Sequence, residues 1–420
     1  MSEYLRLSCL CNRAGVQVMD QPQLVYLLVE LMPGEALAET RLPLNFALLL
    51  DHSGSMAGEK LRTMKEAVKN IIDQLGPDDI LSIITFESKT HVIVPAQPAA
   101  NKAELKRHVE LIKDAGGTNM APGLRGALKQ VSQKHAESRI NRIVLLTDGE
   151  ATDKEDDSRW VANEAGEKGI PIIALGFGHD WNEDFLFDLS DRSVLAEPGS
   201  RKGKADYIPT PKEANKIFQE VYQSMQVVAD QVNLTLRMVQ GLEGRRVWQV
   251  TPLIRDLGRG VIQGRAIVVP VGDLEKSGAA YLAEIMLPPR PAGIVRVAQA
   301  EVTYRAPGGG PQREAVDVIL NFSPDAAIYS PLNGRVMNVV EKVQAFKLQT
   351  QALDEAQAGE VGSATRKLRQ AVTILLSQGE TDLAAQMQQE ADRLEQSGQI
   401  SSEGKKTIAL TSRKTVRLSD

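Results

Sequence analysis

An apolar run that ends abruptly in oxygen-bearing side chains constrains this chain most. Residues 48–55 read LLLDHSGS, so Asp51, Ser53 and Ser55 follow directly on a hydrophobic segment. Strands of a parallel sheet are buried on both faces and read as continuous apolar runs, which predicts a central strand from Phe46 to Leu50. In open α/β sheets ligands bind just outside the carboxyl ends of the strands, where alternating side chains can converge on one point. We therefore expect a ligand site at this strand end.

Two further segments supply side chains of the same kind. Residues 115–120 read AGGTNM and place Thr118 behind two glycines, which allow a backbone to approach an ion closely. Residues 142–150 read RIVLLTDGE, a second buried strand that ends in Asp148. The candidate ligands are all carboxylates or hydroxyls, without thiol or imidazole: Asp51, Ser53, Ser55, Thr118 and Asp148. Such ligands favour Mg²⁺, with Mn²⁺ or Ca²⁺ as alternatives, and disfavour zinc.

These three segments, in this order and at strand ends, resemble the metal-ion-dependent adhesion site of the von Willebrand factor A domain. DHSGS is similar to its D-x-S-x-S turn, GGTNM to its threonine loop and LLTDGE to its distal aspartate, so all five positions match. The resemblance extends through IIALGFG at 172–178 and covers about residues 44–225. It implies a doubly wound, Rossmann-like α/β domain in which an Asp or Glu of a partner protein completes the coordination of the metal.

The charge of the site indicates the same function. Only two of the candidate ligands are charged and the hydroxyl ligands are neutral, so a divalent cation with an open coordination position attracts an acidic side chain. This favours a non-enzymatic, metal-dependent protein-binding module. One alternative is a Mg²⁺-dependent phosphoester hydrolase, although no histidine or lysine is recognisably paired with the site as a general acid or base. Another is a subunit that assists an AAA motor on a separate chain, since no Walker A motif occurs here.

Composition excludes several other classes of function. The formal net charge of −5 and the pI near 5.8 argue against a nucleic-acid-binding protein, which needs a basic face. No apolar run approaches the roughly 18 residues of a membrane span, and the first residues lack the basic and apolar regions of a signal peptide. We therefore expect a cytoplasmic protein without a membrane partner. A length of 420 residues predicts about three domains.

The remainder of the chain predicts a β-sandwich and a helical region. Strand-like segments at 4–10 and 24–32 cannot form a stable unit alone, and further strand-like segments recur between 231 and 322. We infer that the early strands complete the later sheet, so that the A domain is an insertion. The expected organisation is N-terminal sandwich strands at 1–43, the A domain at 44–228, the rest of the sandwich at 229–323, helices at 324–399 and a flexible basic tail at 400–420.

The helical region shows a period near 3.6, with one face formed by Val336, Val339, Val340, Val343 and Phe346. A helical hairpin or small bundle is favoured over a tetratricopeptide array, because only one faintly similar unit is visible and at least three are normally needed. The tail concentrates lysine and arginine among Thr407, Thr411 and Thr415. It is expected to be mobile, and the alternative is a segment that a kinase or a phosphothreonine reader recognises.

Other polar residues receive simpler interpretations. Cys9 and Cys11 are two apart and poorly placed for a disulfide, so they are interpreted as apolar cysteines and not as a metal or redox pair. His52 is expected to face solvent or to lie outside the ligand set. His179 and Asp180 follow a strand end and are interpreted as loop residues. The acidic cluster is interpreted as the negative start of a helix, with a second cation site as the alternative: Asp153, Glu155, Asp156 and Asp157.

Overall fold

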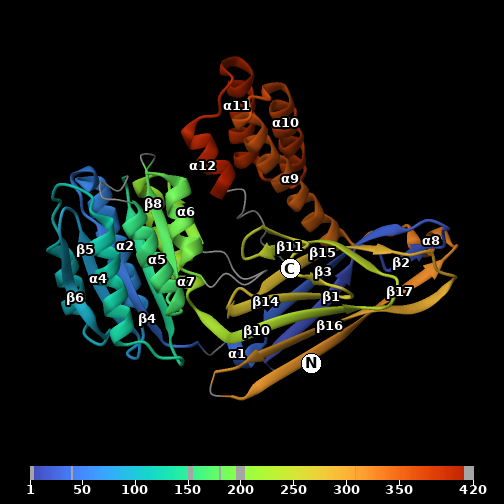
Figure 1. The fold of residues 1–420 in the computed structure, drawn as a ribbon, viewed down its shortest axis with the longest axis horizontal. Helices are drawn as coiled ribbons and strands as arrows, with labels where there is room; N and C mark the ends of the chain where they lie inside the picture. The colour runs from blue at the N-terminus through green and yellow to red at the C-terminus, as the bar shows by residue number, and fades with distance from the viewer. Residues whose placement is uncertain are drawn as a thin grey trace. The chain divides into compact units, whose positions relative to one another are not determined.

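The computed structural model describes residues 4–38, 41–149, 155–178, 181–194, 204–307 and 309–410. The chain forms two units, one from residues 40–228 and the other from residues 1–39 together with 229–420. We call the first the α/β unit and the second the flanking unit (Figure 1). The α/β unit therefore interrupts the sequence of the flanking unit, as the strand pattern predicts.

A sheet of mostly parallel strands organises the α/β unit. Its strands are β4 (Leu44–Asp51), β5 (Ile80–Phe86), β6 (Thr90–Pro98), β7 (Ile140–Thr147), β8 (Ile172–Phe177) and β9 (Lys204–Ile208). They lie in the order β6-β5-β4-β7-β8-β9, and only β6 runs antiparallel to its neighbour. The chain moves outward from β4 to β5 and later returns to β7 on the other side of β4. Strands β4 and β7 thus flank the switch point of the sheet, where open α/β sheets bind ligands.

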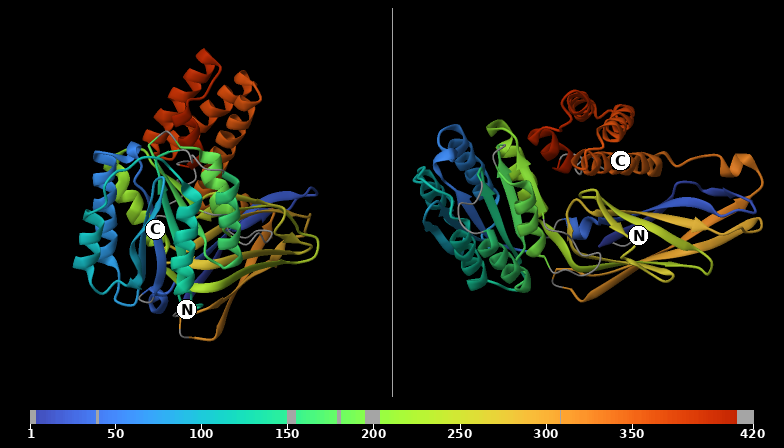
Figure 2. Two further views of the ribbon diagram at one scale, coloured as in Figure 1. Left: turned by 60° about the vertical axis from the view of Figure 1, so that its left-hand side comes forward. Right: turned by 45° about the horizontal axis from the view of Figure 1, so that its top comes forward.

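Helices cover both faces of this sheet (Figures 1 and 2). They are η1 (Gly54–Met56), α2 (Glu59–Gln74), α3 (Lys102–Glu110), α4 (Met120–Gln133), α5 (Glu155–Glu167), α6 (Glu183–Arg192), η2 (Pro211–Glu213) and α7 (Ala214–Ser224). Phe46, Leu48 and Leu50 face a core filled from α2, α3 and α7. The opposite face meets α4, where a side chain on Gly123 would crowd Leu49. Every residue of β4 is buried, which explains its continuous apolar sequence.

The two ends of the α/β unit meet. The backbone N–H of Leu42, just before β4, donates a hydrogen bond to the carbonyl of Val227 over 3.1 Å. Val227 begins β10 (Val227–Met238), which carries the chain on into the flanking unit. The α/β unit thus starts and finishes at one place, as an inserted domain requires.

The flanking unit contains two sheets, and residues from before the insertion enter both. One sheet has the order β1-β3-β15-β11-β12 and consists of β1 (Leu5–Cys11), β3 (Gln23–Pro33), β15 (Ala279–Leu287), β11 (Glu243–Thr251) and β12 (Arg255–Gly258). Strand β3 pairs with β1 on one side and with β15 on the other, with Leu28 opposite Leu282. The early strands therefore find their partners across the insertion.

The second sheet has the order β13-β14-β10-β16-β17-β2. In addition to β10, it consists of β13 (Ile262–Gln263), β14 (Ala266–Glu275), β16 (Gly293–Arg305), β17 (Pro311–Ser323) and β2 (Gly15–Gln17). Strand β1 of the first sheet contacts β16 and β17 of the second, and Figure 2 shows the two sheets as facing layers. The short helices α1 (Glu35–Ala38) and α8 (Ala326–Tyr329) adjoin β3 and β17.

Four consecutive segments of the described chain form the helical region: α9 (Gly334–Gln357), α10 (Val361–Ser377), α11 (Thr381–Ser397) and α12 (Ser402–Leu410). Val336, Val339 and Val343 of α9 pack on Leu28 and Trp248 of the first sheet. The later part of α9 joins α10, α11 and α12 around a separate apolar core. The region is therefore a small bundle and extends beyond a hairpin.

The expectation of a flexible tail from residue 400 is wrong for residues 402–410, which form α12. Ile408 is 2% exposed and Lys406 is 1% exposed, so the helix is held by tertiary contacts that its composition does not reveal. Thr407 is also buried, whereas Thr411 and Thr415 lie outside the described residues. Among the described residues, every helix is too short or too polar to cross a bilayer.

Candidate metal centre

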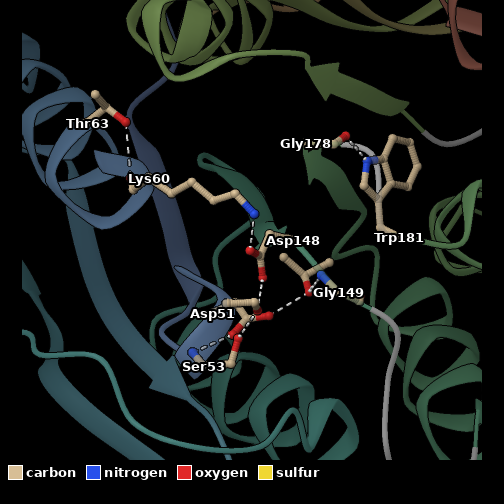
Figure 3. A network of polar contacts seen from close by, with 10 residues as sticks. Asp51, Ser53, Lys60, Thr63, Asp148, Gly149, Gly178 and Trp181 are labelled. Carbon is tan, nitrogen blue, oxygen red and sulfur yellow. Dashed lines mark hydrogen bonds and ion pairs between the residues drawn. The ribbon is translucent and has the colours of Figure 1, made fainter. Parts of the chain in front are cut away.

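Three of the expected ligand residues, Asp51, Ser53 and Asp148, lie close together where β4 and β7 end (Figure 3). Asp51 is the last residue of β4, and Ser53 and Ser55 follow in the turn that contains η1. Asp148 comes directly after β7. Because the two strands are parallel neighbours in the sheet, their carboxyl ends bring both aspartates to one rim.

The carboxylate of Asp51 is fully buried, and both of its oxygens accept hydrogen bonds. Oδ1 accepts from the backbone N–H of Ser53 at 2.8 Å, and Oδ2 accepts from the hydroxyl of Thr147 at 2.7 Å. Burial raises the pKa of Asp51 above its ordinary value, the Thr147 and Ser53 hydrogen bonds oppose the rise, and the charge of Asp148 adds to it. An ionised Asp51 therefore needs a nearby positive charge.

A line of oxygen atoms connects the turn after β4 to the aspartate after β7. The hydroxyls of Ser53 and Ser55 are 3.0 Å apart, and the Ser55 hydroxyl donates to Oδ1 of Asp148 over 2.6 Å. In octahedral Mg²⁺ sites the metal–oxygen distance of about 2.1 Å sets neighbouring ligand oxygens about 3 Å apart. The spacing of these side chains is therefore close to that of a ligand set.

Thr118 belongs to the loop before α4, which lies beside the same turn. Its Oγ1 is 4.0 Å from the position that a Cβ on Gly149 would occupy. On the other side of the loop, the backbone N–H of Ala115 donates to the carbonyl of His52 over 2.8 Å. Thr118 is thus held next to the segment that carries Asp148.

We call these five residues the rim cluster: Asp51, Ser53, Ser55, Thr118 and Asp148. All offer oxygen atoms, and all except Ser55 are buried. Two carboxylates, both at most 1% exposed, concentrate negative charge there. A hard divalent cation fits this donor set, because such ions take oxygen ligands and would offset the buried charge.

The position of His52 contradicts one of the two interpretations given from the sequence. The ring is 7% exposed, so the solvent-facing interpretation is wrong. Its Nδ1 lies 2.7 Å from the carbonyl oxygen of Lys113, which ties the turn after β4 to the loop that carries Thr118. The imidazole therefore connects the two loops.

Two polar residues at this rim, Thr147 and Lys60, are not predicted from the sequence. Thr147 ends an apolar run and has a high strand propensity of its own, so its hydroxyl is not marked by any pattern. Lys60 is the second residue of α2, and its Nζ lies 2.5 Å from Oδ2 of Asp148 (Figure 3). A cation in the first turn opposes the helix macrodipole, which is the one signal in the sequence that marks Lys60 as unusual.

The structure describes only some of the other polar residues near this rim. Glu155, Asp156 and Asp157 occupy the first turn of α5, which confirms the helix-start interpretation for these three. Arg159 binds Glu155, Asp156 and Asp188 with N–O distances of 2.7 to 3.0 Å. Asp153, His179 and Asp180 lie outside the described residues.

Comparison with known proteins finds matching families for the α/β unit and for the helical region. The von Willebrand factor type A domain family matches residues 45–202, and the family described as Sll0103-like, C-terminal alpha-helical domain matches residues 334–418. The Synechocystis sp. protein sll0103 is 31% identical over 280 residues, covering 65% of this chain and 64% of that protein. Inter-alpha-trypsin inhibitor heavy chain H3 from Homo sapiens is 34% identical over 162 residues, 35% of this chain and 18% of that protein. The chain thus spans less than two thirds of these relatives.

Solved structures support the same fold. The structure "von Willebrand factor type A from Catenulispora acidiphila" aligns with a TM-score of 0.72 at 20% identity and covers 99% of this chain and 98% of that chain. The ArnB paralog VWA2 from Sulfolobus acidocaldarius aligns with a TM-score of 0.53 at 16% identity and covers 98% of both. The chain therefore contains a von Willebrand factor type A domain, built into a β-rich unit and followed by a helical domain of the Sll0103-like type.

Proposed function

We propose that the chain is a metal-dependent protein-binding module. In this proposal the rim cluster holds Mg²⁺, with Mn²⁺ or Ca²⁺ as substitutes, and the ion takes an Asp or Glu carboxylate from a partner protein. The von Willebrand factor type A domain is a general protein-interaction domain and often depends on a metal. As part of the same proposal, we place the function in the cytoplasm.

The observation that carries the proposal is the pair of buried carboxylates joined by hydroxyls. Asp51 and Asp148 are at most 1% exposed and lie at the ends of adjacent strands. A buried carboxylate is costly unless a cation or hydrogen-bond donors compensate it. A divalent ion held by this set would compensate both aspartates, and the exposure of Ser55 leaves the cluster accessible to a partner's carboxylate.

Metal binding is tested first with Mg²⁺ alone. Calorimetric titration of the full chain should show binding that Asp51→Ala abolishes. If only the folded chain binds, Mg²⁺ at about 100 times its dissociation constant should raise the free energy of unfolding by about 2.7 kcal/mol in the wild type. The variant should gain nothing. Equal Mg²⁺-dependent stabilisation of both proteins would show that the ion binds elsewhere.

Substitution of two threonines distinguishes the loss of a metal ligand from a general loss of stability. Thr118→Ala removes a hydroxyl of the rim cluster, whereas Thr63→Ala removes one that bonds to the Glu59 carbonyl of its own helix. The two side chains are similarly buried, at 7% and 8% exposure. Thr118→Ala should weaken Mg²⁺ binding about tenfold or more, and Thr63→Ala should leave it unchanged. The reverse order would remove Thr118 from the ligand set.

The partner is tested by its dependence on the ion. Proteins recovered on the immobilised full chain should be compared with and without a chelator, and between wild type and Asp51→Ala. A partner that binds through the metal is lost in both treatments. Replacing one Asp or Glu of that partner by Asn or Gln should then abolish binding. A recovered protein that tolerates every such replacement contradicts the proposed carboxylate contact.

The hydrolase alternative predicts a different result. A phosphoester such as p-nitrophenyl phosphate would be turned over in the presence of Mg²⁺, and Asp51→Ala would stop the reaction. Turnover at the usual enzymatic scale of about 1 per second or faster would overturn the binding-module proposal. Metal binding without turnover supports it.

A further inference from the structure

Lys60 places a positive charge against the rim cluster. Its Nζ forms an ion pair with Oδ2 of Asp148 at 2.5 Å, while Oδ1 of the same carboxylate accepts from Ser55. The Lys60 side chain is 27% exposed and Asp148 is fully buried. The described partners thus already engage both oxygens of Asp148, one through a cation and the other through a hydroxyl (Figure 3).

The position of Lys60 is electrostatically unusual within its own helix. It lies in the first turn of α2, where the macrodipole favours negative side chains such as the adjacent Glu59. The helix N-terminus therefore does not stabilise the ammonium there. The stabilising partner is Asp148, which directly follows β7.

The end of β8 lies close to the ammonium group of Lys60. Gly178 has a φ of 76°, a conformation that favours glycine, and a Cβ added there would lie 3.5 Å from Nζ of Lys60. The indole N–H of Trp181 donates to the carbonyl of Gly178 over 2.8 Å. The ammonium is thus held between the ends of β7 and β8 (Figure 3).

We propose that Lys60 competes with the divalent cation for Asp148. This inference rests on the metal-binding function proposed above. In the metal-free protein the ammonium neutralises part of the buried charge and holds Asp148. A divalent ion bound by the same carboxylate would be repelled by the ammonium at short range. Lys60 therefore stabilises the metal-free protein more than the loaded protein and lowers the affinity for the ion.

The same contact influences what the loaded site binds. The charges of Asp51 and Asp148 together equal that of one divalent ion, and Lys60 adds a further positive charge. The loaded site with its lysine therefore carries an excess of one positive charge, which a single carboxylate of the partner would neutralise. Lys60 thus couples metal retention to the presence of an acidic partner.

Two substitutions of Lys60 test the competition. Lys60→Met retains an apolar stem of similar length without the charge, and Lys60→Arg retains the charge. Titration of the full chain with Mg²⁺ alone should show about tenfold tighter binding for Lys60→Met than for the wild type. Lys60→Arg should stay near the wild-type affinity. As a control, Lys69 lies on the same helix and forms an ion pair with Glu110 at 2.9 Å. Lys69→Met removes this ion pair and should leave the affinity for Mg²⁺ unchanged.

Thermal unfolding gives a second readout that a purely structural ion pair would not produce. Without metal, Lys60→Met should melt below the wild type because the buried carboxylate of Asp148 loses its cation. Saturating Mg²⁺ should remove this deficit. A deficit of the same size with and without Mg²⁺ means that Lys60 only supports the fold.

The outcomes distinguish the inference from the function on which it rests. Equal Mg²⁺ affinity in wild type and Lys60→Met, with binding lost in Asp51→Ala, overturns the competition and leaves the metal site in place. Absence of Mg²⁺ binding in both the wild type and Lys60→Met overturns the proposed function, and the competition with it.

Discussion

The hydroxyl of Thr147 donates a hydrogen bond to Oδ2 of Asp51 over 2.7 Å, so the last residue of β7 holds the last residue of β4. The other carboxylate oxygen, Oδ1, accepts from the backbone of Ser53. Asp51 is thereby oriented from two sides, by its own turn and by the neighbouring strand. Because Thr147 is fully buried, no solvent molecule can readily replace its hydroxyl.

Replacing Thr147 by valine should therefore damage the site while preserving the packing. Thr147→Val keeps the shape of the side chain but leaves Oδ2 of Asp51 without its donor, which should cost about 1–3 kcal/mol of stability. Chemical denaturation with a chelator and with Mg²⁺ would measure this loss, and the affinity for Mg²⁺ should fall as well. Thr147→Ser keeps the hydroxyl and is the matched control. If serine proves as harmful as valine, the methyl group and not the hydrogen bond matters.

The sequence predicts the strand ends well because burial on both faces leaves a clear pattern. The run that ends in Asp51 is buried throughout, as its continuous apolar residues require. The early strands also pair across the insertion, because isolated strands need partners. The rim cluster could be predicted from three separate segments because the carboxyl ends of parallel strands lie at one edge of the sheet.

Residues that act through the three-dimensional arrangement could not be predicted in this way. Lys60 reaches Asp148 only because α2 begins beside the end of β7, and no local pattern encodes that approach. The helix α12 was expected to be a tail because its sequence is basic and rich in threonine. Burial of Ile408 against the other helices overrides that composition.

The packing of α12 gives a second prediction. A side chain on Gly404 would clash with the carboxyl group of Glu390, which accepts hydrogen bonds from the backbone N–H and hydroxyl of Ser401 at 2.8 and 2.7 Å. Gly404→Ala should therefore destabilise α12 by about 1–3 kcal/mol through overpacking. Hydrogen exchange over residues 402–410 would measure the effect.

The control for this substitution is Gly362→Ala. Gly362 lies in α10 with nothing within 4 Å of an added Cβ, so alanine there should be neutral or stabilise by up to about 1 kcal/mol. Unchanged exchange of α12 in Gly404→Ala would contradict the close packing of Gly404 on Glu390.

The two cysteines give a pH-dependent prediction. Burial raises the pKa of the Cys9 thiol from 9.0 to about 12, and the neighbouring Cys11 adds to the shift. The thiolate is the reactive form, and at pH 8 it is about one part in 10⁴ of a thiol with that pKa. Native Cys9 should therefore react with iodoacetamide at least about 100-fold more slowly than in urea, as mass spectrometry would show.

The same shift has a defined effect on stability. The folded state binds the Cys9 proton more tightly than the unfolded state does. The resulting contribution is fully present below pH 9.0 and is lost as the pH rises towards about 12. Cys9→Ala should remove this alkaline decline. Rapid labelling of the native thiol at pH 8 would instead favour the redox-pair interpretation.

The hydrogen bond between Leu42 and Val227 has a consequence for how the chain unfolds. For the flanking unit, residues 40–228 are one long loop between β3 and β10. The entropy cost of closing a flexible loop grows only with the logarithm of its length, by about 0.6 kcal/mol for each doubling. The flanking unit can therefore remain folded after the insert has melted, and we expect the chain to show two separable transitions. A ligand that binds only the insert would raise one melting temperature and leave the other in place.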